Sequence, residues 1–120
     1  MLLVEDDGDL RRLFRTALTL ENFSVREARD GFEAIRQLDV DPPDVVILDL
    51  MMPGLDGFAV RRELAASAST RNIPIVIVTS LHREDVAHLD VQCILTKPVM
   101  PPELIAAVRR CMAAGRGTGV

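Results

Sequence analysis

The sequence predicts an α/β fold: a single doubly wound domain in which helices cover both faces of a five-stranded parallel sheet. Short apolar runs alternate along the chain with segments of helical periodicity, which is typical of repeated strand–helix units. The runs 44–49 and 73–79 are apolar on both faces and indicate central strands of a parallel sheet. A chain of 120 residues has room for one such domain.

The order of the elements follows from this alternation. Strands are expected at residues 1–4, 24–28, 44–49, 73–79 and 91–95. Helices are expected where apolar residues recur at helical spacing, over residues 10–18, 34–38, 58–64 and 104–112. Between residues 81 and 89 we expect a further helix of only one or two turns. The domain is expected to cover residues 1–114, followed by a frayed, glycine-rich tail over residues 115–120.

Composition narrows the classes of function. A net charge of −4 with scattered basic residues argues against direct binding of nucleic acid. No stretch approaches the roughly 18 apolar residues of a membrane span, so no membrane partner is expected. Cys93 and Cys111 form neither a CxxC motif nor a disulfide-dense pattern, which predicts free thiols in a reducing compartment. We therefore expect a cytoplasmic protein.

Polar side chains follow the predicted strands at the point where each strand ends. Glu5, Asp6 and Asp7 follow the first strand, and Asp49 ends the third. Thr79 ends the fourth strand, and a lysine at position 97 follows the fifth. In an open parallel sheet these positions share one edge, where ligands bind. The sequence thus predicts a site made of carboxylates, a hydroxyl and an ammonium group.

Such a cluster has a definite chemistry. Carboxylates that repel one another require protons or a cation, and Mg²⁺ is a hard ion that accepts one or two carboxylates while keeping several waters. With the charge neutralised, Asp49 could attack phosphorus and form an acyl phosphate. Lys97 would bind one phosphoryl oxygen as a point charge, and the hydroxyl of Thr79 would donate to another.

Four sequence motifs carry a resemblance to a known family. They are residues 3–7 (LVEDD), 46–57 (VILDLMMPGLDG), 75–80 (IVIVTS) and 95–98 (LTKP). With these motifs in this order, the sequence resembles the response-regulator receiver domains of two-component signalling over nearly its whole length. The resemblance implies a flavodoxin-like sheet with strand order 2-1-3-4-5.

The resemblance also implies a magnesium site. Asp6 matches the principal acidic metal ligand of the family, with Glu5 assisting, often through water. Asp49 and the backbone carbonyl of Met51 match the remaining protein ligands.

The resemblance further implies a signalling switch rather than an enzyme, one that supports its own phosphoryl transfer and dephosphorylation. Asp49 matches the residue that takes phosphorus from a sensor histidine kinase or a phosphotransfer protein. Thr79 matches the switch hydroxyl, and Lys97 the phosphate-binding lysine, which in the family precedes a cis peptide, here to Pro98. An output protein or domain is implied as a second partner, and a homodimer is left open.

Some of these residues also have purely structural explanations. Asp7 fits the N-terminus of the first helix as well as it fits a site, and Asp56 fits a helix cap better than a ligand. His82 and His88 lie in a polar segment and are expected to be exposed.

The sequence departs from the family in one region. Thr79 and Lys97 are 97 − 79 = 18 positions apart, about one helical turn fewer than is usual in the family. Ile94 stands where the family usually has Tyr or Phe. These departures motivate an alternative, a receiver-like protein-binding module that does not switch by phosphorylation. A phosphatase with an aspartyl nucleophile is disfavoured, because Met51 stands where such enzymes usually carry a second Asp.

Overall fold

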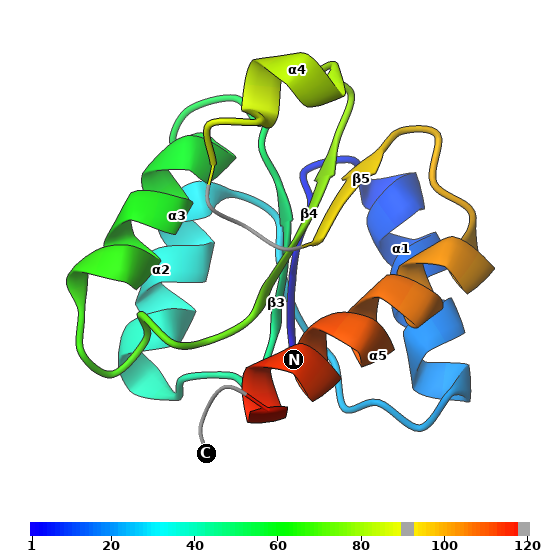
Figure 1. Ribbon diagram of the computed structural model, residues 1–120, viewed down its shortest axis with the longest axis horizontal. Coiled ribbons are helices and arrows are strands. Elements are labelled where there is room, and N and C mark those ends of the chain that lie inside the picture. The colour runs from blue at the N-terminus through cyan, green and yellow to red at the C-terminus, as the bar shows by residue number, and fades with distance from the viewer. Residues whose placement is uncertain (90–92, 118–120) are drawn as a thin grey trace.

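The computed structural model describes residues 1–89 and 93–117. Its five strands form one parallel sheet in the order β2-β1-β3-β4-β5, which confirms the predicted fold and strand order (Figure 1). The strands are β1 (Leu2–Val4), β2 (Arg26–Ala28), β3 (Val46–Asp49), β4 (Ile75–Thr79) and β5 (Cys93–Thr96). The helices are α1 (Gly8–Leu20), α2 (Gly31–Val40), α3 (Gly57–Ala66), α4 (Arg83–Val86) and α5 (Pro101–Gly117).

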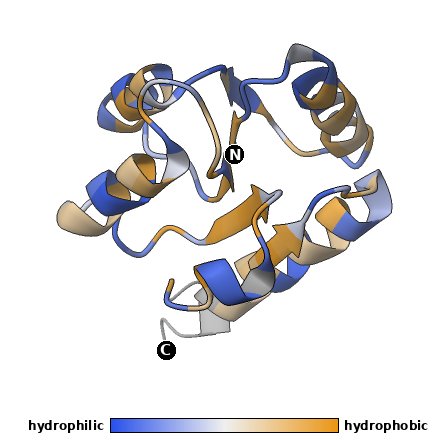
Figure 2. Cartoon of the chain, turned by 90° about the horizontal axis from the view of Figure 1, so that it is seen from above, coloured by the Kyte–Doolittle hydropathy of each residue, from blue (hydrophilic) through white to orange (hydrophobic). Residues whose placement is uncertain are grey.

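The helices form two layers, one on each face of the sheet. Figure 1 shows α2 and α3 on one side and α1 and α5 on the other. Because successive strand residues point to opposite faces, Leu3 and Ile47 pack with Phe14 of α1 on one face. Their neighbours Leu2 and Val46 pack on the opposite face with α2 and α3. Hydrophobic residues are concentrated on the strands between the helical layers (Figure 2).

Three helices begin at an aspartate whose side chain caps them. Asp7 accepts hydrogen bonds from the backbone N–H groups of residues 9 and 10 at the start of α1. Asp30 and Asp56 each accept one N–H bond at the starts of α2 and α3. Such bonds satisfy donors that have no partner within the helix. The structural explanations of Asp7 and Asp56 are therefore confirmed.

The fourth helix is short, as the spacing predicted. It has four residues, and buried Val86 and Leu89 anchor its segment to the sheet. His82 and His88 are exposed, as expected, and the ring of His88 stacks on that of Phe58 in α3. Residues 91 and 92 of the predicted last strand lie outside the described residues.

In the C-terminal half, the expected tail and the expected free thiols can be compared with the structure. Helix α5 extends to Gly117, three residues beyond the expected domain boundary, and residues 118–120 lie outside the described part of the chain. The domain boundary itself stays a prediction. Cys93 and Cys111 are free and buried. No helix within residues 1–89 and 93–117 is long and apolar enough to cross a membrane.

Gly57 allows α3 to begin against the end of β3. A Cβ atom at this position would clash with the carbonyl oxygen of Asp49 and lie 2.6 Å from the Cα of Leu50. At Gly8 a Cβ atom would meet only a side-chain nitrogen of Arg11, at 3.9 Å.

We therefore expect Gly57→Ala to lower the free energy of unfolding by about 1–3 kcal/mol, because backbone atoms must move to admit the methyl group. Gly8→Ala is the matched control and should leave stability unchanged or raise it by up to about 1 kcal/mol. Urea unfolding of both variants measures the difference, and equal stabilities would contradict the steric argument.

Candidate functional site

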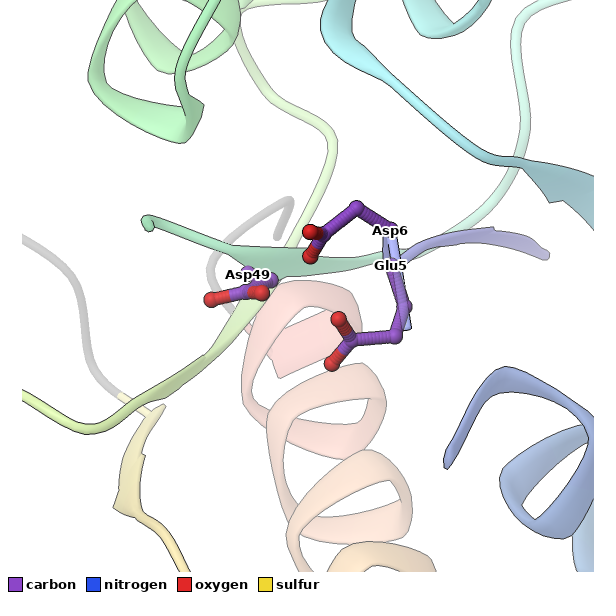
Figure 3. A group of neighbouring side chains, drawn as sticks. All are labelled: Glu5, Asp6 and Asp49. Carbon is purple, nitrogen blue, oxygen red and sulfur yellow. The ribbon is translucent and has the colours of Figure 1, made fainter. Parts of the chain in front are cut away.

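The predicted polar residues meet at the carboxyl edge of the sheet. Asp49 is the last residue of β3, and β1 ends one residue before Glu5. Figure 3 shows the carboxyl groups of Glu5, Asp6 and Asp49 turned toward one another. One ligand atom from each of the three lies within 4.8 Å of the others. The parallel register of β1 and β3 thus brings together carboxylates that are more than forty positions apart in the sequence.

Asp49 is held in a fixed orientation at the bottom of the cluster. Only 2% of its surface is exposed. One carboxylate oxygen accepts a hydrogen bond from the backbone N–H of Met51 at 3.0 Å, and the other lies 3.3 Å from the ammonium group of Lys97. The carboxylate is therefore buried, ion-paired and pointed into the cluster.

Glu5 is equally buried, at 2% exposure. Burial is the largest cause that raises the pKa of Glu5, and the hydrogen bond and charge of the neighbouring Asp49 add to it; the pKa is raised from 4.5 to about 7. Lys97 at 3.1 Å and the backbone N–H of Asp7 at 3.2 Å act in the opposite direction. Near neutral pH this carboxyl group can therefore either carry a proton or, as a carboxylate, bind a cation.

Lys97 is placed by strand pairing. Thr79 and Thr96 are partners in the ladder between β4 and β5, and the backbone N–H of Lys97 donates to the carbonyl of Thr79 at 2.7 Å. Burial lowers the pKa of Lys97, but Glu5 and Asp49 together outweigh this effect and raise it. The peptide bond to Pro98 is cis, as the family resemblance implied.

Other predicted site residues lie at the margin of the cluster. Asp6 is exposed while its carboxylate belongs to the acidic group. The side chain of Met51 is 52% exposed, and its backbone N–H contacts Asp49. Thr79 is fully buried, and its hydroxyl accepts a hydrogen bond from the N–H of Leu81 at 3.1 Å. The hydroxyl therefore contacts the loop that leads to α4.

Arg11 also contacts the site, although no sequence motif identifies it. Its guanidinium donates to the backbone carbonyl of Glu5 at 2.9 Å. Arg11 precedes Phe14 by three positions and Leu18 by seven, so it occupies the inward face of α1 with these two buried residues. A charged residue at an apolar position of a helix was the signal that could have identified it.

The residues present fit a divalent metal ion. Three carboxylates lie together and one ammonium group contacts two of them, so negative charge remains in the cluster at neutral pH unless a proton or cation is added. All the donors are oxygen atoms, which Mg²⁺ prefers. The arrangement can hold such an ion next to a carboxylate nucleophile and a phosphate-binding ammonium group.

Comparisons with other sequences agree with this geometry. The model of the response regulator receiver domain matches residues 1–109. Response regulator PleD of Caulobacter vibrioides is 40% identical over 113 residues, which cover 90% of this chain and 25% of that protein. Response regulator MprA of Mycobacterium avium is 38% identical over 113 residues, covering 91% of this chain and 49% of that protein. The chain thus spans half or less of these curated relatives.

Solved structures give the same result. A sensor protein from Polaromonas sp. JS666 matches with a TM-score of 0.86 and 28% identity, over 95% of this chain and 96% of that one. The signal receiver domain of a signal transduction histidine kinase from Syntrophus aciditrophicus matches with a TM-score of 0.85 and 31% identity, over 94% and 89%. With the family match over nearly its whole length, the chain belongs to the response regulator receiver domains of two-component systems.

Proposed function

We propose that this chain is a phosphoacceptor receiver in which Asp49 takes a phosphoryl group in a Mg²⁺-dependent reaction. The observation that carries the proposal is the meeting of three carboxylates within 4.8 Å, two of them contacting the ammonium group of Lys97. Receiver domains generally are signalling switches that bind Mg²⁺ at an acidic pocket. The cluster of Glu5, Asp6 and Asp49 supports placing that pocket at this edge of the sheet.

The proposed metal ligands are Glu5, Asp6, Asp49 and the backbone carbonyl of Met51. Bound Mg²⁺ would neutralise the carboxylates and the phosphoryl oxygens, which otherwise repel each other. Glu5 and Asp49 are held by hydrogen bonds before any ion arrives, so little reorganisation is required of them.

Asp49 is the proposed nucleophile. A carboxylate oxygen forms the new bond to phosphorus while the phosphorus–nitrogen bond of the donor phosphohistidine breaks. The donor imidazole, protonated on its other ring nitrogen, keeps the electron pair and leaves as neutral histidine. Lys97, already 3.3 Å from Asp49, would bind a phosphoryl oxygen and stabilise its charge. The donor class is a sensor histidine kinase or phosphotransfer protein, and hydrolysis of the acyl phosphate in the same pocket would reset the switch.

Thr79 is the proposed connection to an output surface. Its hydroxyl now accepts a hydrogen bond from the N–H of Leu81. If the hydroxyl turned to donate to a phosphoryl oxygen, Leu81 would lose this partner and the segment leading to α4 would shift its conformational equilibrium. The switch would operate in the cytoplasm, where Cys93 and Cys111 stay reduced.

A second candidate is a receiver-like module that binds its partner regardless of phosphorylation. The four-residue α4 and the aliphatic Ile94, which packs beside Leu50, Ile77 and Val86, favour it. Without an aromatic ring at position 94, the output face has fewer ways to respond to the pocket.

Incubation with Mg²⁺ and acetyl phosphate should add the mass of one phosphoryl group to the protein, and Asp49→Ala should add none. Mass spectrometry measures both. Asp9→Asn is the matched control, because Asp9 is an exposed acid near the pocket but outside the cluster, and it should be phosphorylated like the wild type. An equal gain of phosphoryl mass in Asp49→Ala, or an undiminished gain of mass with excess chelator, would contradict the proposal.

Metal-free stability should depend on the protonation of Glu5. Its pKa in the folded protein, about 7, exceeds the ordinary 4.5, so folding is favoured by the proton below about pH 4.5 and this contribution is lost as pH rises through about 7. Glu5→Gln keeps a neutral group at all pH values. Urea unfolding should therefore show that the stability of Glu5→Gln relative to the wild type is greater at about pH 8 than at about pH 5. A pH-independent difference would refute the burial argument.

Phosphorylation should speed amide hydrogen exchange at Leu81, because the hydroxyl of Thr79 would no longer accept from it. In Thr79→Val, which has no hydroxyl, exchange at Leu81 should be fast before and after phosphorylation. Exchange measured by NMR tests both variants. Phosphorylated wild type with unchanged exchange at Leu81 would favour the non-switching module.

A further inference from the structure

We propose that Arg11 is a positioning residue for the metal pocket, acting through the backbone of the turn between β1 and α1. The inference rests on the proposed Mg²⁺ site. Arg11 lies in α1, with 23% of its side chain exposed, and contacts two other elements. One guanidinium nitrogen donates to the carbonyl of Glu5 at 2.9 Å, and Nε lies 3.3 Å from a carboxylate oxygen of Glu27 in β2.

With the bond from Arg11, every polar group of Glu5 has a partner. Its backbone N–H donates to the carbonyl of Ala28 at 3.1 Å, and its two carboxylate oxygens contact Lys97 and the N–H of Asp7. The backbone carbonyl is the remaining group, and Arg11 holds it. Glu5 thus cannot rotate without losing several of these bonds.

Asp6 depends on this arrangement more than Glu5 does. Its side chain is exposed, and in the part of the chain that the structure describes no hydrogen bond holds its carboxylate. The backbone therefore sets the position from which this side chain extends. The peptide unit between Glu5 and Asp6 is planar, so fixing the carbonyl oxygen of Glu5 fixes the plane from which the Cα of Asp6 extends. Arg11 holds that oxygen.

Glu27 keeps Arg11 in place. It pairs with Leu3 in the ladder between β1 and β2, and its backbone carbonyl accepts a hydrogen bond from Gln37 of α2 at 2.6 Å. Its carboxylate also lies 3.7 Å from Arg15. The planar guanidinium of Arg11 bridges an acceptor in the turn after β1 and an acceptor on β2, and a lysine, with a single ammonium group, cannot reproduce this geometry.

Charge and geometry predict opposite effects of removing Arg11. Arg11 is a cation near a site for a cation, so its loss would strengthen Mg²⁺ binding if only its charge mattered. If it positions the turn, its loss weakens binding, because the backbone carbonyl of Glu5 is released and Asp6 is no longer aimed at the cluster. Loss of residues that support metal ligands typically costs about 10–100-fold in affinity.

The experiment is a Mg²⁺ titration of the metal-free protein by isothermal calorimetry, without any phosphodonor. Arg11→Gln should weaken Mg²⁺ binding about 10-fold. Arg12→Gln is the matched control, because it removes the same charge from the next position of α1, where the side chain is 70% exposed and pairs with Asp9. It should change the affinity by less than about two-fold. Amide exchange at Asp6 and Asp7 in the metal-free protein should be faster in Arg11→Gln alone.

The outcomes separate the two proposals. Failure of the wild type to bind Mg²⁺ would overturn the proposed function. Binding by the wild type, with equal or tighter binding by Arg11→Gln, would overturn the role of Arg11 and leave the function intact. Arg11→Lys retains the charge and serves if Arg11→Gln does not fold; weaker binding by this variant supports the role, and wild-type affinity refutes it.

Discussion

Burial of two carboxylates against a single lysine is the constraint on which the rest of the site depends. Glu5 and Asp49 are both 2% exposed, and a buried charge is costly unless it is paired. Lys97 contacts both, yet one ammonium group balances only one of them. Burial, and after it the neighbouring Asp49, raise the pKa of Glu5, and a proton or a metal ion can offset the cost of its charge. The fold thus keeps two carboxylates buried beside one ammonium group.

The sequence was informative wherever a local pattern determines a global position. The ends of apolar strands located Glu5 and Asp49 because parallel strands all end at one edge, and the short interval between Thr79 and Lys97 predicted the short α4. Caps such as Asp56 followed from turn chemistry. These features depend only on period, order and spacing along the chain.

Contacts between distant side chains could not be predicted in this way. The link from Arg11 to Glu27 requires the register that pairs Leu3 with Glu27, and periodicity does not give that register. The hydrogen bond between Thr79 and Leu81 depends on a side-chain rotation that a strand pattern leaves open. Both contacts support the residues that would touch the metal or the phosphoryl group, or the backbone beside them. A sequence motif therefore identifies the pocket more readily than what holds it in place.

The two cations beside the pocket have different consequences for metal binding. Lys97 contacts one carboxylate oxygen each of Glu5 and Asp49, two of the proposed metal ligands, so an entering ion would share these carboxylates with it. Arg11 contacts a backbone carbonyl and a carboxylate on β2, outside the acidic cluster. It can therefore keep its bonds while the pocket fills. Glu27 also balances its charge, so the geometry of the turn is maintained with little electrostatic penalty for the incoming ion.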